Sequence, residues 1–373
     1  MTAPQLGSVA IKGAIESAEL QPEDIEEVLM GNVVSAGVGQ APARQAALGA
    51  GLPTSVICTT VNKVCASGMK AVMLGAQSIQ LGINDCIVAG GMESMSNIPH
   101  YLQGSRLGLR MGHGQLTDGM ILDGLWDPYK DVHMGTCADR CAQQYSISRA
   151  EQDAHAIESH KRARRAHDAG FSGREIMPVE VPGRRGQQPT VVDRDEGPLK
   201  LNQEKLQQLR PAFSNGKAPG TVTPGNASPV TDGAAALVLT SPAKARQRGL
   251  TILARIRGYG DAEREPDQFT TAPALAIPRA LKAAGLTLDD IDYFEINEAF
   301  SVVDLVNRKL LGLDPDRVNV HGGAVAIGHP IGASGAALII RLLSVLKAKC
   351  ARLGVAAICN GGGGASAIVL ERS

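Results

Sequence analysis

Four short stretches of the sequence each place a side chain capable of covalent or proton-transfer chemistry among small residues, where a strand is expected to end. They are "VCASG" with Cys65, "INEAF" with Asn297, "AIGHPIGASG" with His329 and "ICNGGGG" with Cys359. A thiol becomes a nucleophile when a base removes its proton, and the glycine and proline beside His329 would hold such a base in a rigid turn. Two thiols and one histidine, without a metal-ligand spacing or a Ser–His–Asp pattern, predict acyl transfer through a thioester formed on the protein.

Cys65 stands where a strand is expected to turn into a helix. Residues 55–61 are rich in Val, Ile and Thr, and small and apolar residues recur at helical spacing over 66–79. The free N–H groups and positive dipole of a helix start would lower the pKa of the thiol and favour the thiolate. The alternative is that Cys65 is a small buried hydrophobe, as free cysteines often are.

Four consecutive glycines, residues 361–364, follow Cys359 and Asn360. Such a run costs backbone entropy, and it is expected where a backbone must come close to a ligand. Two alternatives stay open at this point: Cys359 as an ordinary strand cysteine, and His329 as a hydrogen-bonded structural histidine.

The elements that must position these residues alternate between helix and strand. Helices are expected over 6–18, 41–49, 66–79, 272–284, 299–311 and 333–347, with strands between them. The alternation predicts an α/β fold with helix-covered sheets. Between 98 and 220 the pattern loosens around a long polar helix at 149–168, and a long irregular segment in a compact protein is usually functional.

The two ends of the chain echo each other. "CASGMKAV" at 65–72 resembles "GASGAALI" at 332–339, and "IVAGGMES" at 87–94 resembles "ICNGGGGAS" at 358–366. Two matches in the same order indicate a duplicated α/β unit. The active site is then expected between the two halves, at the carboxyl ends of the strands.

Composition excludes several classes of function. The 373 residues include 37 Lys and Arg against 37 Asp and Glu, so the net charge favours neither nucleic acid nor an anionic membrane surface. No apolar run approaches the length of a membrane span. The seven cysteines include no CxxC pair and no metal-ligand spacing, which predicts free thiols in a reducing compartment and no metal site.

Six motifs together resemble the thiolase family, and within it the acetoacetyl-CoA thiolases. They are "VNKVCASGMKA", "VAGGMESMS", "GNASPVTDGAAA", "NEAF", "GGAVAIGHPIGASG" and "CNGGGGAS", and they extend over nearly the whole chain. The resemblance implies the thiolase fold: two duplicated halves with mixed, mostly parallel sheets and helices in αβαβα layers, plus an inserted loop domain. The implied division is 1–97 and 225–250 for the first half, 98–224 for the loop domain and 251–373 for the second half.

The resemblance also implies the chemistry, acetyl-CoA C-acetyltransfer. Cys65 would carry the acetyl group of a first acetyl-CoA, and Cys359 would remove a proton from the methyl carbon of a second one. The product would be acetoacetyl-CoA, with the direction set by metabolite levels. His329 would activate Cys65 and stabilise the enolate with Asn297, and the N–H groups of Cys65 and Gly361 would form a second oxyanion hole.

No permanently bound cofactor is implied, since coenzyme A is carried by the substrates. By resemblance, its pantetheine and adenine would be covered by residues of the loop domain and the "NEAF" turn, with Phe269 as a wall of the acyl pocket. The full set of matching positions is Leu125, His133, Met134, Phe213, Ser228, Ala299, Phe300 and Phe269. Ser228 would hydrogen-bond a pantetheine amide.

The sequence departs from the family in two places. The family's first strand, with its Arg-Thr-Pro turn, does not precede the opening helix, and the resemblance places that strand in the middle of the first sheet. We therefore expect a gap there that lowers stability and activity. His155 stands where potassium-dependent relatives carry a tyrosine, which leaves a potassium site uncertain although Val325 matches another contact.

Assembly, location and three competing activities complete the expectations. Residues 104–124 correspond to the loop through which family members form tetramers, so a homotetramer built as a dimer of dimers is expected. The cytoplasm is the expected location, with mitochondria and peroxisomes as alternatives. The competing activities are a broader 3-ketoacyl-CoA thiolase, an acyl-carrier-protein condensing enzyme, and a thiolase-like protein that binds acyl-CoA without catalysis. The condensing enzymes pair one cysteine with two histidines, whereas Asn297 and Cys359 stand here.

Overall fold

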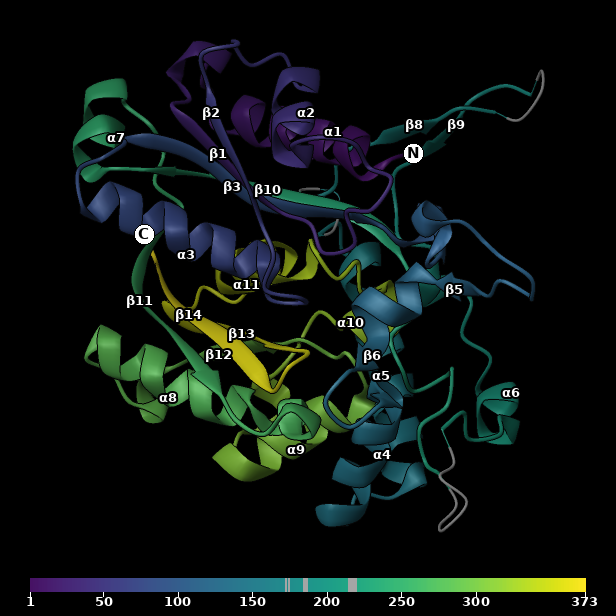
Figure 1. The fold of residues 1–373 in the computed structure, drawn as a ribbon. Helices are drawn as coiled ribbons and strands as arrows, with labels where there is room; N and C mark the ends of the chain where they lie inside the picture. Colours follow the sequence, from purple (N-terminus) through teal and green to yellow (C-terminus); the bar gives the residue numbers. More distant parts are fainter. Residues whose placement is uncertain (172, 174, 184–186, 214–219) are drawn as a thin grey trace.

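Two four-stranded sheets with a pair of helices between them form the centre of the fold (Figure 1). The structure is a computed structural model, and it describes residues 1–171, 173, 175–183, 187–213 and 220–373. The first sheet has the order β10-β3-β1-β2, with β1 at Glu27–Gly31, β2 at Ile57–Val61, β3 at Cys86–Ser94 and β10 at Asp232–Thr240. In it β1 pairs in parallel with both β2 and β3, and only β10 runs antiparallel.

The second sheet has the order β11-β14-β13-β12, with β11 at Ala254–Glu263, β12 at Tyr293–Ile296, β13 at Leu353–Asn360 and β14 at Gly364–Arg372. Only β12 and β13 are parallel in it, because β14 runs antiparallel to both of its neighbours. Mixed sheets are therefore confirmed, but "mostly parallel" holds for the first sheet alone. The turn from β13 to β14 requires positive φ at Gly362 (85°) and Gly363 (91°), which explains part of the glycine run.

Helices complete five layers, in agreement with the αβαβα expectation. The first sheet is covered on its outer side by α1 (Ala3–Ser17) and α2 (Pro42–Gly49), and the second by α8 (Pro273–Ala284), with α9 (Ser301–Leu311) beyond it (Figure 1). Between the sheets lie α3 (Ser67–Gln80) and α11 (Ser334–Ala348), which contact each other and both sheets. The short α7 (Pro242–Arg248) joins β10 to β11.

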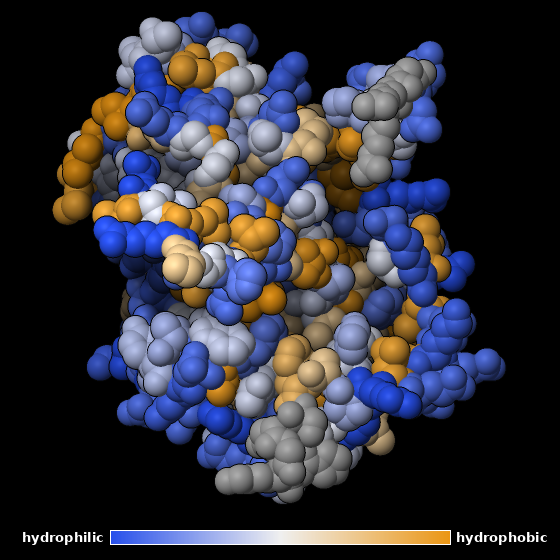
Figure 2. All heavy atoms as spheres, turned by 45° about the vertical axis from the view of Figure 1, so that its right-hand side comes forward, coloured by the Kyte–Doolittle hydropathy of each residue, from blue (hydrophilic) through white to orange (hydrophobic). Residues whose placement is uncertain are grey.

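The loosely patterned middle of the chain lies along one side of these layers (Figure 1). Its helices are α4 (Met134–Gln144), α5 (Arg149–Asp168) and α6 (Gln203–Gln208), and α5 matches the expected helix at 149–168. Three small antiparallel pairs belong to it: β4 (His100–Leu102) with β5 (Leu116–Asp118), β6 (Trp126–Asp127) with β7 (Val132–His133), and β8 (Val179–Val181) with β9 (Thr190–Val192). On the face that includes this region, Figure 2 shows hydrophobic side chains gathered across the middle, between more hydrophilic upper and lower parts.

The expected gap in the middle of the first sheet is wrong. The strands β1 and β3 pair directly, from Glu27 opposite Ile87 to Gly31 opposite Gly91, so no strand lies between them. Strand β14 of the second sheet corresponds to β10 of the first. β14 has β11 on its outer side, whereas in the described part of the chain β10 pairs with β3 alone. Because the loss of stability was inferred from a central gap, that inference loses its basis.

Backbones of the two halves come into direct contact where α11 begins. A Cβ atom on Gly91 of β3 would overlap the carbonyl oxygen of Gly332, and one on Gly31 of β1 would lie 2.6 Å from the same oxygen. On Gly68 of α3 a Cβ atom would lie 3.0 Å from the backbone nitrogen of Ala336. These distances are shorter than side chains tolerate, so only glycine allows β1, β3 and α3 to approach the start of α11 this closely.

Replacing Gly91 by alanine is expected to destabilise the protein strongly. The added methyl group would meet the Gly332 carbonyl, which belongs to the backbone and moves only if the two halves separate. We expect Gly91→Ala to lower the free energy of unfolding by about 3 kcal/mol, as overpacking of a core does. Urea unfolding followed by circular dichroism would measure this.

The matched control is Gly173→Ala, since a Cβ at this exposed glycine meets nothing within 4 Å. Equal unfolding midpoints for the two variants would contradict the proposed contact between the halves.

Candidate active site

Cys65 sits in a tight turn between β2 and α3. The turn places Val64 in the left-handed region, with φ at 46°, which is unusual for a β-branched residue. The N–H of Val64 donates to Asn62 Oδ1 at 2.9 Å, and Ala66 is the N-cap of α3. A strained turn held by a side-chain hydrogen bond fixes the thiol of Cys65, which is buried at 8% exposure.

The expectation of a lowered pKa for Cys65 is wrong. Burial raises the pKa of the Cys65 thiol to about 11, although hydrogen bonds from the N–H groups of Gly361 and of Cys65 itself lower it. The buried carboxyl of Glu93 raises it further. The loss of water around a thiolate thus outweighs the backbone donors, so the resting thiol is protonated at neutral pH and needs a base before it can attack.

Cys359 lies next to Cys65, at the end of β13, although it comes from the other half of the fold. Burial raises the pKa of its thiol well above the usual value, and the neighbouring Cys65 raises it further. Around it pack the buried side chains of Met134, Phe269 and Ala299. The surroundings of this second thiol are therefore apolar, and a thiolate formed there would be a strong base.

His329 is a buried, neutral imidazole whose tautomer follows from its partners. Its Nδ1 lies 2.6 Å from Ser334 Oγ, which donates its own proton to the carbonyl of Pro330 at 3.0 Å. The serine oxygen must therefore accept a hydrogen bond from Nδ1–H, which leaves the lone pair on Nε2. Nε2 is 3.3 Å from Asn297 Nδ2, which donates to it. Burial lowers the pKa of His329 to about 4, so Nε2 is ready to accept a proton at neutral pH.

Ser334 is a hydrogen-bond partner of His329 that the sequence reasoning missed. It is the first residue of α11, five positions after His329 in "GHPIGASG", and its spacing from the histidine was the available signal. Asn297 follows β12, where its N–H donates to the carbonyl of Ala357 at 3.0 Å. The structure thus brings together Asn297, His329 and Ser334 in one hydrogen-bonded row, and Cys65, Cys359 and Gly361 in a second group.

The proposed coenzyme A contacts fall into three neighbouring places. The His133 and Phe213 rings stack with centroids 4.4 Å apart, and Ser228 donates to the carbonyl of Ala299 at 2.9 Å. The lone pairs of Ser228 can still accept from an amide N–H. Met134, Phe269, Ala299 and Phe300 pack in one cluster with Cys359, and Leu125 ends the π-helical turn Ile121–Leu125.

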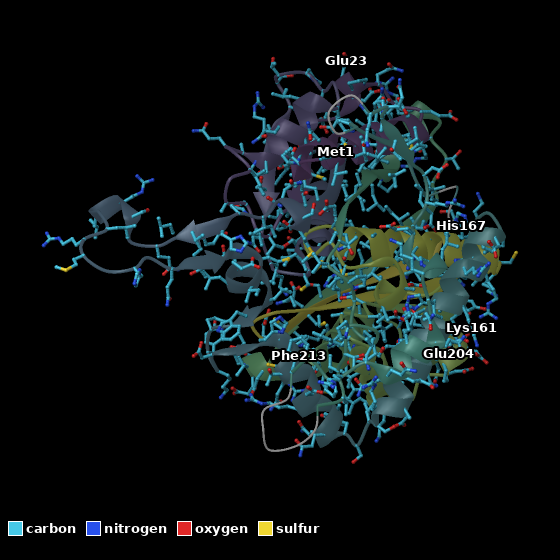
Figure 3. The ribbon with its side chains drawn as sticks, turned by 90° about the vertical axis from the view of Figure 1, so that its right-hand side faces the viewer. Met1, Glu23, Lys161, His167, Glu204 and Phe213 are labelled. Atoms are coloured by element: carbon cyan, nitrogen blue, oxygen red, sulfur yellow. The ribbon has the colours of Figure 1, made fainter. Side chains whose placement is uncertain are left out.

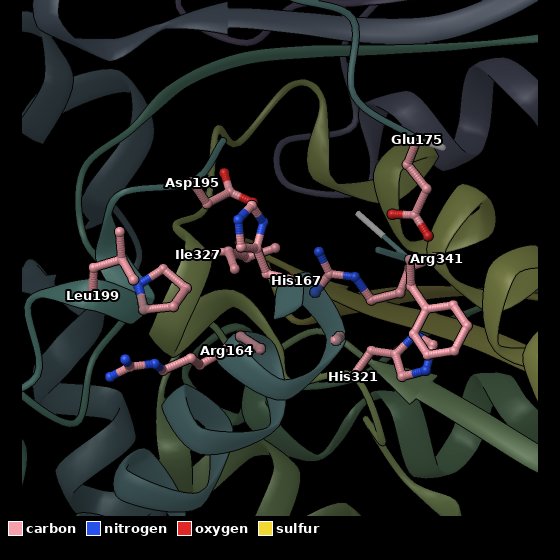
Figure 4. A pocket seen from close by; sticks show the side chains of 12 residues that line it. Arg164, His167, Glu175, Asp195, Leu199, His321, Ile327 and Arg341 are labelled. Atoms are coloured by element: carbon pink, nitrogen blue, oxygen red, sulfur yellow. The ribbon is translucent and has the colours of Figure 1, made fainter. Parts of the chain in front are cut away.

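An enclosed cavity lies elsewhere, beside α5, and none of the candidate catalytic residues lines it (Figure 4). It holds about 20 Å³ and is lined by polar side chains that include Arg341, Glu175, Asp195 and His167. This volume admits a water molecule but not a coenzyme. The described residues contain no group of three or more His, Cys, Asp or Glu side chains arranged to hold a metal ion, and no described helix is long and apolar enough to cross a membrane.

Comparisons with known proteins agree with the motifs. The family model for the thiolase N-terminal domain matches residues 1–243, and the model for the thiolase C-terminal domain matches residues 250–372. The finer division of the chain into a loop domain and two halves stays a prediction. Acetyl-CoA acetyltransferase 2 of Arabidopsis thaliana is 60% identical over 372 residues, covering 100% of this chain and 92% of the relative. The cytosolic acetyl-CoA acetyltransferase of Gibberella zeae is 58% identical over 370 residues, and the match covers 99% of this chain and 92% of the relative.

Among solved structures, a thiolase from Ascaris suum in complex with coenzyme A is similar to this chain over its whole length. The TM-score is 0.94 at 45% sequence identity, and the match covers 100% of this chain and 94% of the Ascaris chain.

Alkylation should report the pKa of Cys65. Because burial raises this pKa to about 11, the rate of reaction with iodoacetamide is expected to rise about tenfold per pH unit from pH 7 to pH 10. Peptide mass spectrometry separates Cys65 from the exposed Cys350, which serves as an internal control for reagent and digestion. A rate at Cys65 that levels off below pH 8 would show a thiolate stabilised by the helix start instead.

Proposed function

This chain belongs to the thiolase family, and we propose that it is an acetyl-CoA C-acetyltransferase, which joins two molecules of acetyl-CoA into acetoacetyl-CoA and CoA in a reversible reaction. The observation that carries the proposal is the meeting of two buried thiols, Cys65 and Cys359, with the N–H of Gly361, in a fold whose buried His329 keeps Nε2 unprotonated. Acetyl-CoA acetyltransferases 51–60% identical to the chain support the same activity.

In the first half-reaction, His329 Nε2 takes the proton of Cys65, and the thiolate attacks the carbonyl carbon of acetyl-CoA. The N–H groups of Gly361 and Cys65, which face the sulfur, support the oxyanion that forms. The C–S bond to CoA then breaks, and the CoA thiolate takes its proton from Cys359. The products are acetyl-Cys65, CoA, a protonated His329 and a Cys359 thiolate.

In the second half-reaction, the Cys359 thiolate removes a proton from the methyl carbon of the second acetyl-CoA. Its raised pKa suits this step, because a weakly acidic thiol is a strongly basic thiolate. The enolate oxygen accepts a hydrogen bond from His329 Nε2–H, with Asn297 beside it. The carbanion attacks acetyl-Cys65, the Cys65 thiolate leaves, and it recovers its proton from His329, so each group returns to its starting state.

Coenzyme A is proposed to lie between the loop region and the "NEAF" turn. The stacked pair His133 and Phe213, the lone pairs of Ser228, and Met134 beside Cys359 support this placement. The Ascaris relative, named as a complex with coenzyme A, supports it as well. The ring of Phe269, which is 2% exposed, packs in the cluster around Cys359, and a large buried side chain there favours a short acyl chain over the longer chains of a broad 3-ketoacyl-CoA thiolase.

A homotetramer and a cytoplasmic location are part of the proposal. Figure 3 shows the hairpin formed by β4 and β5 projecting away from the body. The side chains of Leu107 and Met111 in this hairpin are almost fully exposed to solvent, and that of Leu116 is largely exposed. An exposed apolar hairpin of this kind suits association with other copies of the chain. Seven free thiols fit a reducing compartment, and the Gibberella relative is named as cytosolic.

Cys65→Ala is expected to abolish acetoacetyl-CoA thiolysis and the transfer of labelled acetyl groups from acetyl-CoA to protein, because no other thiol meets two backbone donors in the site. Thiolysis by the unaltered chain, assayed with acetoacetyl-CoA and with longer 3-ketoacyl-CoA esters, tests the activity itself and the preference for short chains. A chain that cleaves none of these esters would overturn the proposed function, and a stable acetyl adduct on Cys65→Ala would move the nucleophile elsewhere.

Cys359→Ala is expected to slow full turnover about 10²–10⁴-fold, as the loss of a positioned acid and base does. The acetylation of Cys65 should fall much less, because CoA can leave as a thiolate and take up its proton outside the site, whereas only Cys359 is assigned the carbon acid of the second substrate. Rapid-mixing acetylation and steady-state turnover on one preparation would separate the two half-reactions. Equal losses in both would argue against the proton transfers assigned to Cys359.

A further inference from the structure

A charged cluster, made of His155, Glu298, Asp304 and Arg308, lies buried behind the catalytic residues. His155 projects from α5, where its Nε2 is 3.1 Å from Glu298 Oε1 and its Nδ1 is 3.3 Å from Asp304 Oδ2. The side chains of Glu298 and Asp304 are only 1% and 2% exposed. Nothing in the proposed chemistry uses this histidine, although its side chain is only 9% exposed.

The geometry fixes the protonation state of His155. Both ring nitrogens face carboxylate oxygens, which accept hydrogen bonds and do not donate them. Nε2 makes a hydrogen bond with Glu298 and Nδ1 makes an ion-pair contact with Asp304, and the doubly protonated imidazolium is the form that suits both carboxylates. His155 is therefore a buried cation in this fold.

The cluster is electrically balanced only while His155 carries its proton. Arg308 Nε lies 2.7 Å from Asp304 Oδ2, so two cations face two carboxylates. The other titratable neighbours are Arg162 on α5, which acts on Asp304, and Glu295 near the end of β12, whose pKa burial raises well above its usual value. The short helix α10 (Ala324–Ile327), which packs on α5, carries no titratable side chain, and Glu204 and Lys205 of α6 are exposed.

Glu298 connects this cluster to the catalytic residues. It directly follows Asn297, and it accepts hydrogen bonds from Ser159 Oγ at 2.7 Å and from the N–H of Val325 at 3.2 Å. Val325 belongs to α10, which ends just before the turn with His329. One carboxylate thus joins α5, the "NEAF" turn and the segment that leads to the catalytic histidine.

We propose that His155 is a positioning residue, a buried imidazolium that holds Glu298 in place and so keeps Asn297 and His329 in register for proton transfer. The proposal rests on the proposed function for its effect on turnover, but the cation itself is tested independently of activity. Removing the charge leaves the buried carboxylate of Glu298 with hydrogen-bond donors but without its cation, and an uncompensated buried charge destabilises a fold.

The proposal predicts a specific dependence on pH. Burial alone would lower the pKa of His155, but the charges of Asp304 and Glu298 outweigh burial and raise it above the usual value of about 6.5. A group with a raised pKa in the folded state stabilises the protein fully below its unfolded pKa. This contribution is lost as the pH rises through the folded value.

The experiment compares the unaltered chain with His155→Gln over the range from pH 6 to pH 9. At pH 6 the variant is expected to melt about 5 °C lower and to show about tenfold lower kcat in acetoacetyl-CoA thiolysis, with a smaller change in KM. At pH 9 the difference in melting temperature should shrink, because the unaltered His155 begins to lose its proton. The control is His160→Gln on the same helix, since His160 Nδ1 faces the carbonyl of Ala156 and no carboxylate. The difference in melting temperature between His160→Gln and the unaltered chain should be the same at every pH.

The double variant His155→Gln/Asp304→Asn separates charge from packing. Removing one carboxylate together with the cation restores the balance between Glu298 and Arg308, so the double variant should melt higher than His155→Gln alone. A melting difference that is constant with pH, or a double variant that fails to fold or melts below the single one, would overturn the proposal. If the unaltered chain shows no thiolysis while the melting pattern holds, the proposed function fails and the buried cation stands.

Discussion

The contact of bare backbone between the two halves is the constraint on which the rest of the structure depends. At Gly91 and Gly332 the halves approach more closely than any side chain allows, and Gly31 and Gly68 extend the same contact to β1 and α3. As a result, the first turns of α3 and α11 lie against each other. The thiol that precedes α3 therefore faces the strand end and glycine turn of the other half, and neither half contains the site alone.

The second physical theme is the separation of neutral and charged groups. Cys65, Cys359 and His329 are all buried and neutral at rest, because burial penalises the charged form of each one. Charged groups are gathered instead in the cluster around His155, where two cations pair with two carboxylates. An apolar site strengthens the hydrogen bonds to a developing oxyanion. In the proposed mechanism the protons pass among Cys65, His329, Cys359 and the two substrates.

The sequence predicted much of this fold because its local signals agree with its tertiary structure. The polar helix at 149–168 was recognised to the residue, and the repeated "ASG" pattern marked the starts of both central helices. The pKa of Cys65 is raised and not lowered as expected, because burial by segments distant in the sequence outweighs the effect of the backbone N–H groups. No local sequence pattern reveals this burial. Strand order within the first sheet and the partner of His329, Ser334, likewise depend on how segments far apart pack together.

The central claim is that Cys65 carries the acetyl group in a site shared by both halves. A crystal structure of the chain trapped with acetyl-CoA tests it most directly. The account predicts an acetyl group on Cys65 Sγ, its carbonyl oxygen accepting from the N–H groups of Cys65 and Gly361, and Cys359 Sγ beside its methyl group. An acetyl group on Cys359 or on another side chain, or a carbonyl oxygen that turns away from Gly361, would contradict it.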